Sequence, residues 1–167
     1  MVFEAMRDLL SFPNPVNETS ARLVAGSVAV LAVLTLAFQQ GWLLPVLAYG
    51  FVARALTGPT LSPLGLLATR VVTPRLPLRH RYAPGPAKRF AQAIGAALTV
   101  TATLLWYVAG AHAAALVLVG VLAAFASLEA ALGVCVGCRL FFLGMRLGLV
   151  PPAVCADCAR VLARDSA

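Results

Sequence analysis

The sequence predicts an all-α membrane protein that crosses the bilayer as four transmembrane helices in two hairpins. Two observations carry this prediction. First, 61% of the 167 residues are hydrophobic and only 11% are charged, with a mean hydropathy of +0.91, whereas soluble domains have about 25% charged residues. Second, four apolar runs occupy most of the chain, so too little remains for a separate soluble domain. We therefore expect residues 1–167 to form a single membrane domain.

The first two apolar runs cover residues 23–38 and 42–56 and are joined only by Gln39-Gln40-Gly41. A link this short predicts two antiparallel helices, which form a hairpin. Each run is shorter than the roughly 20 residues that a span usually needs. Because long basic side chains reach the interface from within a span, Arg22 and Arg54 are expected to extend both runs.

The third and fourth apolar runs cover residues 90–109 and 111–134, and each is long enough to cross a bilayer. Only Gly110 and its neighbours separate them, which predicts a second antiparallel hairpin. The remaining stretch, residues 135–167, contains all four cysteines of the chain. We expect it to form a helical tail at the membrane surface.

Between the hairpins, residues 63–73 are predicted to form a short helix. Ser62 is a favoured N-cap residue, Pro63 suits the first turn, and Pro74 is expected to end the helix. The apolar side chains recur with helical spacing and form one stripe, made of Leu64, Leu67, Ala68, Val71 and Val72. Such a helix is too short to cross a bilayer, so we expect it to lie at the interface.

The basic residues predict the orientation, because Lys and Arg near span ends resist translocation. With four spans, all thirteen of them fall on one side of the membrane, so both termini are predicted to be cytoplasmic. These cations border apolar runs, which favours anionic lipid headgroups over nucleic acid as their partner. The basic residues are Arg7, Arg22, Arg54, Arg70, Arg75, Arg79, Arg81, Lys88, Arg89, Arg139, Arg146, Arg160 and Arg164.

The four cysteines form two C-x-x-C pairs, Cys135 with Cys138 and Cys155 with Cys158. One interpretation is thiol chemistry, because the first thiol of such a pair attacks a disulfide or persulfide and the second resolves the mixed species. In this interpretation Cys135 attacks, Cys138 resolves, and Cys155 and Cys158 relay. The predicted topology places all four thiols at the cytoplasmic face, where permanent disulfides are not expected.

Two other interpretations of the cysteines stay open. The spacing C-x2-C-x16-C-x2-C fits a four-cysteine zinc site formed by Cys135, Cys138, Cys155 and Cys158, which would anchor the tail as a non-enzymatic scaffold. The apolar insert, residues 139–154, speaks against zinc, and we expect no other cofactor. Alternatively, the thiols only pack, since cysteine is often buried.

Arg54 and Glu129 are the charged residues set well within apolar runs. An ionisable group in a span is costly and marks a functional site by default, and we expect these two to pair across helices. The pair either fixes the helix register or serves chemistry, with Glu129 relaying a proton to a leaving thiolate near Cys135. Arg54 is also consistent with a small transporter that draws in a sulfur anion, which would need a homo-oligomer to form a pore.

Gly133 and Gly137 bracket Cys135 with the spacing G-x-x-x-G. In membrane proteins this spacing lets two helices approach closely. The cysteine segment is therefore predicted to dock against another span or a second copy of the chain.

The segments NPVNETSAR, SPLG, PAKRFAQAIG and CVGC follow one another between Asn14 and Cys138. This ordered set resembles a bacterial integral membrane family, domain of unknown function 4395. The resemblance implies a multi-pass protein of the bacterial inner membrane. Members tend to be encoded near thioredoxin-like and rhodanese-like proteins, which implies thiol or sulfur metabolism with such a sulfurtransferase or thioredoxin-like partner. The resemblance transfers no catalytic residue and leaves open whether the chain is an enzyme.

Overall fold

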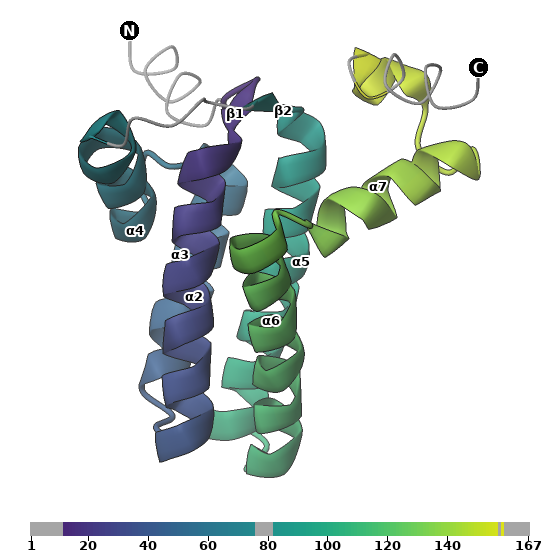
Figure 1. The fold of residues 1–167 in the computed structure, drawn as a ribbon. Helices are drawn as coiled ribbons and strands as arrows, with labels where there is room; N and C mark the ends of the chain where they lie inside the picture. The colour runs from purple at the N-terminus through teal and green to yellow at the C-terminus, as the bar shows by residue number, and fades with distance from the viewer. Residues whose placement is uncertain (1–11, 76–81, 157, 159–167) are drawn as a thin grey trace, which may run out of the picture.

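A computed structural model describes residues 12–75, 82–156 and 158. It is all-α apart from two very short strands, and its long helices run side by side as a bundle (Figure 1). The α-helices of the described residues are α2 (Glu18–Phe38), α3 (Leu43–Thr57), α4 (Pro63–Leu66), α5 (Gly85–Tyr107), α6 (His112–Leu132) and α7 (Val136–Arg146).

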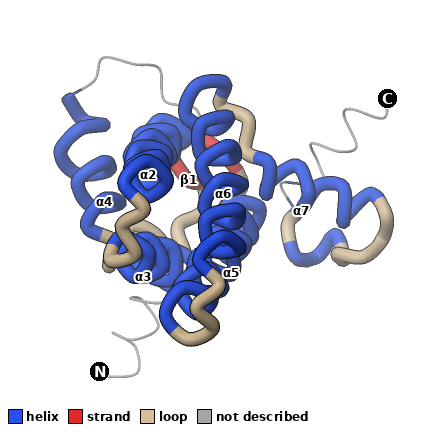
Figure 2. Tube along the Cα trace, turned by 90° about the horizontal axis from the view of Figure 1, so that it is seen from below, coloured by secondary structure: helices blue, strands red, loops and turns tan. Residues whose placement is uncertain are grey.

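The four long helices do not pack as two separate hairpins. The most extensive contacts join α2 with α6 and α3 with α5, and the view along the bundle shows the four helices around a common centre (Figure 2). The predicted turns do reverse the chain after α2 and after α5, but the two halves of the sequence interleave. One reason is the α2–α3 link, where Gly41 lies against the indole of Trp106 so closely that a Cβ would not fit.

Three helices are long and apolar enough to cross a membrane: α2, α5 and α6. The fourth predicted span, α3, has 15 residues and is apolar but shorter. Two predicted boundaries change as well. Helix α5 begins at Gly85 rather than at residue 90, with proline in its first turn, and α6 ends at Leu132 because Gly133 takes a positive φ of 68°.

The predicted surface helix exists, but its helical type changes along its length. After α4 the chain continues as a π-helix (Leu67–Val72) and then as a 3₁₀ turn (Thr73–Arg75). Ser62 is confirmed as the N-cap, since its hydroxyl accepts the Gly65 N–H at 3.3 Å. The predicted apolar stripe is only partly buried. A π-helix has wider turns than the α-helix assumed, and so Leu67 is 51% exposed whereas Thr73 is buried.

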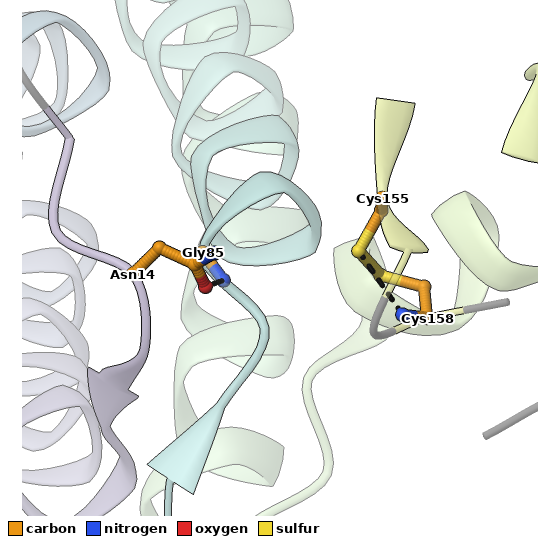
Figure 3. The surroundings of a disulfide bond; sticks show 4 residues. All are labelled: Asn14, Gly85, Cys155 and Cys158. Carbon is orange, nitrogen blue, oxygen red and sulfur yellow. Dashed lines mark hydrogen bonds between the residues drawn. A yellow bond between two sulfur atoms is a disulfide. The ribbon is translucent and has the colours of Figure 1, made fainter. Parts of the chain in front are cut away.

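Several tertiary contacts tie this end of the bundle together. Strands β1 (Val16–Asn17) and β2 (Tyr82–Ala83) pair antiparallel and join the start of α2 to the start of α5. The side chain of Asn14 accepts the Gly85 N–H at 2.9 Å (Figure 3). The Asn17 side chain accepts the Thr19 N–H and caps α2. None of these contacts was predicted, because each joins segments far apart in sequence or depends on a local turn.

The basic residues that the structure describes lie near the starts of α2 and α5, near the end of α3, on the turns after α4 and on α7. These segments lie toward one end of the bundle, together with the two strands (Figure 1). There the Arg22 guanidinium donates to the carbonyls of Ala130 and Ala131 and satisfies the last turn of α6. Arg89 likewise donates to the Ala55 carbonyl of α3. Five of the thirteen predicted cations lie outside the described residues, namely Arg7, Arg79, Arg81, Arg160 and Arg164.

Candidate functional site

A cavity of about 310 Å³ lies between the long helices at the charged end of the bundle. Side chains of α2, α3, α5 and α6 line it together with the start of α7, and most of them are apolar. Its polar lining includes three residues singled out from the sequence, Arg54, Glu129 and Cys135, and two that were not, Lys88 and Gln92. A mainly apolar cavity with a few convergent polar groups is the usual form of a small-molecule site.

Arg54 points into the bundle rather than toward the interface. It is buried, and its Nε donates to Oε1 of Gln92 at 2.9 Å while its guanidinium also donates to the Ser62 hydroxyl at 3.1 Å. Its Cζ lies 4.6 Å from the ring centroid of Phe51, a cation–π arrangement. The expectation that Arg54 reaches the interface is therefore wrong, because polar groups on α5 and on the N-cap of α4 offer it partners inside the fold.

Glu129 has a different partner from the one predicted. Its carboxylate forms an ion pair with the Lys88 ammonium group, so the direct pair with Arg54 is not the one that the structure forms. Sequence reasoning missed Lys88 because it was assigned to the loop before the third run. The early start of α5 instead places Lys88 in the first turn, opposite the last turns of α6.

Cys135 is positioned by the turn between α6 and α7. Gly133 ends α6, and Cys135 then takes an extended conformation as the N-cap of α7, where its Sγ accepts the Cys138 N–H at 3.4 Å. A Cβ on Gly137 would come within 2.6 Å of the Ala91 Cα, so glycine is what lets α7 dock on α5. The predicted docking of the cysteine segment thus occurs within the chain, through Gly137 rather than through Gly133.

The two thiols of this pair are free and electrostatically unequal. A hydrogen bond from the Cys138 thiol lowers the pKa of Cys135, and the nearby Lys88 cation acts in the same direction. The same hydrogen bond raises the pKa of Cys138, because that thiol must keep its proton to donate, and burial adds to the rise. The pKa of Cys135 is therefore lowered while the pKa of its neighbour Cys138 is raised.

The second pair is in a different state. Cys155 and Cys158 form a disulfide (Figure 3), whereas no permanent disulfide was expected from the sequence. Both are buried in a cluster with Phe141 of α7 and Ala87 of α5, and Cys138 packs against that cluster. The reason is local: a turn after the 3₁₀ helix Pro152–Val154 lets the Cys158 N–H donate to Cys155 Sγ at 3.2 Å and brings the sulfurs together.

Residues 16–146 match the family described as Domain of unknown function (DUF4395). The chain belongs to this family. No curated protein and no solved structure matches the chain. The matched region contains every polar residue named above around the cavity, including Cys135, and it ends before the second cysteine pair.

The segments by which the chain resembles DUF4395 proteins meet around the cavity, although they lie far apart in sequence. Asn17 comes from the first segment, Gly65 from SPLG, Lys88 and Gln92 from PAKRFAQAIG, and Cys135 from CVGC, and all five line the cavity. The motif residues of this DUF4395 chain therefore build one site rather than four unrelated features.

The four cysteines of this DUF4395 chain do not come together as one cluster. All four cysteines lie among the described residues, and these contain no group of three or more His, Cys, Asp or Glu side chains able to hold a metal ion. Two of the thiols are also already joined to each other. The residues present thus do not fit a four-cysteine zinc site in this conformation.

Proposed function

We propose that this DUF4395 protein carries out thiol-disulfide exchange at the surface of a membrane, with Cys135 as the attacking thiol and Cys138 as the resolving thiol. The observation that supports this most is the position of Cys135 at the N-terminus of α7, where its thiolate accepts hydrogen bonds from Cys138 and lies near Lys88. Backbone donors and a cation at a helix N-terminus favour a reactive thiolate.

The exchange consists of two displacements. The Cys135 thiolate attacks one sulfur of a substrate disulfide, so a mixed disulfide forms and one substrate thiolate leaves. Cys135 then no longer accepts the Cys138 proton, so Cys138 ionises and attacks the Cys135 sulfur. The second substrate thiolate leaves, and a Cys135–Cys138 disulfide remains. Glu129 lines the same cavity as Cys135 and takes the proton from Cys138 in this proposal.

The same steps can take up a persulfide. The Cys135 thiolate accepts the outer sulfur and displaces the carrier thiolate, and Cys138 then releases that sulfur as hydrosulfide while the disulfide closes. The tail disulfide acts as the relay, because Cys138 packs against the cluster that holds Cys155 and Cys158. The partner is a thioredoxin-like or rhodanese-like protein, as the resemblance implies.

The proposal also includes a fourth span and an orientation in the membrane, in addition to the three long apolar helices. Helix α3 is the fourth span, with Trp42 at one interface, and the basic end of the bundle faces the cytoplasm, with both termini there and anionic headgroups around it. In a bacterium this is the inner membrane. The uneven distribution of Arg and Lys among the described residues supports the orientation.

Trapping of a mixed disulfide tests the proposal. The Cys138→Ser variant of the full-length protein is placed in nanodiscs and mixed with oxidised thioredoxin or with a peptide that contains a disulfide. It is expected to form a stable mixed disulfide with each of them. The matched Cys135→Ser variant should form none, because it lacks the attacking thiol. Equal trapping by both variants, or a zinc content of one per chain with thiols that react only after chelation, would exclude Cys135 as the exchange nucleophile.

A further inference from the structure

Arg54 is a buried cation whose charge no acidic side chain neutralises. It is only 5% exposed, and both of its hydrogen-bond partners, Gln92 and Ser62, are uncharged. The Glu129 carboxylate lines the same cavity but is paired with Lys88. Arg54 itself forms no ion pair with any residue in the described part of the chain. A buried charge is costly unless it is paired, so Arg54 lacks a counter-ion within the fold.

The Arg54 guanidinium also keeps donors that the protein does not use. Its Nε donates to Gln92 at 2.9 Å and its Nη1 donates to the Ser62 hydroxyl at 3.1 Å, which leaves three of the five N–H groups of a guanidinium. Among the described residues, every fully enclosed side-chain nitrogen or oxygen has a hydrogen-bond partner. Nη2 has none, so it reaches free space, and the cavity is the space that Arg54 lines.

The surrounding residues hold this free donor in a fixed position. Arg54 Cζ lies 4.6 Å from the ring centroid of Phe51, and Gly50 leaves room for the guanidinium, since a Cβ there would lie 3.2 Å from Nη1. A donor that is already fixed loses little freedom when a ligand binds. Charge-assisted hydrogen bonds from a planar guanidinium suit the oxygens of a carboxylate or sulfonate. The arrangement therefore favours an oxyanion group as the missing counter-ion.

The cavity also limits the size of such a ligand and places it beside a thiol. Its volume of about 310 Å³ is at the lower end of the range for small-ligand sites, about 300–1,000 Å³. Cys135 lines it and is only 9% exposed, so a small molecule in the cavity lies beside this thiol. Pro13, Pro15, Gly58 and Pro59 line it too, and they belong to connections at the end of the bundle. The cavity thus extends to that end and is not confined to the middle of the long helices.

We propose that this cavity binds a small molecule that carries both an oxyanion group and an S–S bond, with Arg54 as the residue that binds the oxyanion. The inference rests on the proposed function, because it names the substrate class of the same exchange site. Arg54 positions the substrate and takes no part in bond breaking. The Cys135 thiolate forms a bond to the nearer sulfur, the S–S bond of the substrate breaks, and the other half of the molecule leaves as a thiolate.

The charge preference of Cys135 tests the proposal. Cys138→Ser protein in nanodiscs of zwitterionic lipid is reacted with dithiodipropionate, bis(hydroxyethyl) disulfide and cystamine, which are anionic, neutral and cationic dialkyl disulfides of similar size. The released thiol is followed with time, and the anionic disulfide should react fastest. Arg54→Gln should lower the ratio of the anionic to the neutral rate about tenfold, which corresponds to one charge-assisted hydrogen bond. An unchanged ratio would overturn the proposal.

Arg89→Gln is the matched control. It removes the same charge from the same end of the bundle, but Arg89 is exposed, donates to the Ala55 carbonyl and does not line the cavity. The ratio should stay nearly the same, because salt screens an exposed charge. A fall as large as that caused by Arg54→Gln would mean that the basic end attracts anions in general, and it would refute a specific role of Arg54.

Gln92→Glu covers the case in which Arg54→Gln does not fold. The two side chains have the same shape, and the new carboxylate replaces the oxygen that lies 2.9 Å from Arg54 Nε. Arg54 then has its counter-ion within the protein, so the ratio of the anionic to the neutral rate should fall as in Arg54→Gln, with no loss of melting temperature. A ratio that stays at the parent value would contradict the proposal.

Binding is measured apart from exchange with the Cys135→Ser/Cys138→Ser protein. Titration with dithiodipropionate should show saturable binding that Arg54→Gln weakens about tenfold, in zwitterionic and in anionic nanodiscs alike. If anionic lipid abolishes this binding, a headgroup phosphate occupies Arg54 and the proposed substrate class is wrong. If nothing binds but Cys138→Ser still traps a partner, the anion site is wrong and the exchange function stands. Binding that depends on Arg54, without any reaction at Cys135, would support the anion site and refute the exchange function.

Discussion

The two C-x-x-C pairs have the same spacing but different surroundings. Cys135 lies at the start of an eleven-residue helix, beside a cavity and a buried Lys–Glu pair, and stays a free thiol. Cys155 lies in a short turn after a 3₁₀ helix, within an apolar cluster, and is bonded to Cys158. The comparison shows that the same two-residue spacing can hold either a free thiol pair or a disulfide, and that the surrounding helix terminus and charges set the pKa of each free thiol.

The sharpest way to break this comparison is to remove the first cysteine of each pair in turn. Cys135→Ser should lower the steady-state rate of disulfide reduction by about a thousandfold, since residues that act as one catalytic unit lose nearly all activity together. Cys155→Ser removes only the relay and should lower the rate with a small disulfide far less. A stopped-flow assay with a chromogenic disulfide measures both. Equal losses would mean that the tail pair, not the cavity pair, attacks the substrate.

The second prediction concerns the Lys88 cation, which lies near Cys135. Lys88→Met leaves the Glu129 carboxylate, whose side chain is only 15% exposed, without its cation, and this should destabilise the protein by about 3 kcal/mol. It should also raise the pKa of Cys135, because the cation that favours its thiolate is gone. Thermal unfolding in detergent and thiol alkylation measure the two effects.

The double variant Lys88→Met/Glu129→Gln serves as the control for this prediction. Because it removes both charges, it should recover a large part of the lost stability. The pKa of Cys135 should be lower than in Lys88→Met, because the Glu129 carboxylate that opposes the thiolate is also gone. No difference in stability between the single and double variants would show that the pair is not buried as described.

The third prediction concerns how α7 is docked. Gly137→Ala places a methyl group within 2.6 Å of Ala91, and such overpacking costs about 1–3 kcal/mol. The shift of α7 should also slow the reaction of Cys135 with iodoacetamide. Gly144→Ala is the matched control on the same helix, because its added Cβ lies 3.4 Å from a flexible Val150 methyl, and it should change neither property much.

The smallest expected effect is the pH dependence of alkylation. The pKa of Cys135 is lowered and that of Cys138 is raised, so the alkylation rate of Cys135 should reach half its maximum below the ordinary thiol value of about 8.5. The reactivity is present above this pKa and falls as the pH drops through it. In the Cys135→Ser variant the pKa of Cys138 should lose most of its rise, because the Cys135 thiolate that accepted its proton is absent. Mass spectrometry of the two labelled peptides separates these titrations.

The sequence predicted the parts of the fold that depend on composition and on single residues. The long apolar helices follow from hydropathy, and the start of α4 follows from Ser62 and Pro63. Each of these depends on a property that a short stretch has by itself. The family was also predicted, because its motif segments are short and continuous.

The partners of buried charges could not be predicted from the sequence. Glu129 was assigned to Arg54 because both stood inside apolar runs, but the start of α5 at Gly85 moved Lys88 from a loop into the first helical turn. Arg54 instead donates to Gln92, which gave no signal in the sequence, and to Ser62, which was predicted only as a helix N-cap. Partner choice depends on which helix faces meet, and the period of a single helix does not contain that information.

The sequence by itself determined that this chain forms long apolar helices and that its four cysteines come in two C-x-x-C pairs. Only the tertiary structure decided that α2 packs with α6 and α3 with α5, and that Cys135, Lys88, Glu129 and Gln92 share one cavity. The physical reason is that hydropathy and capping act within a few turns of one helix, whereas a cavity depends on how side chains from different helices fit together.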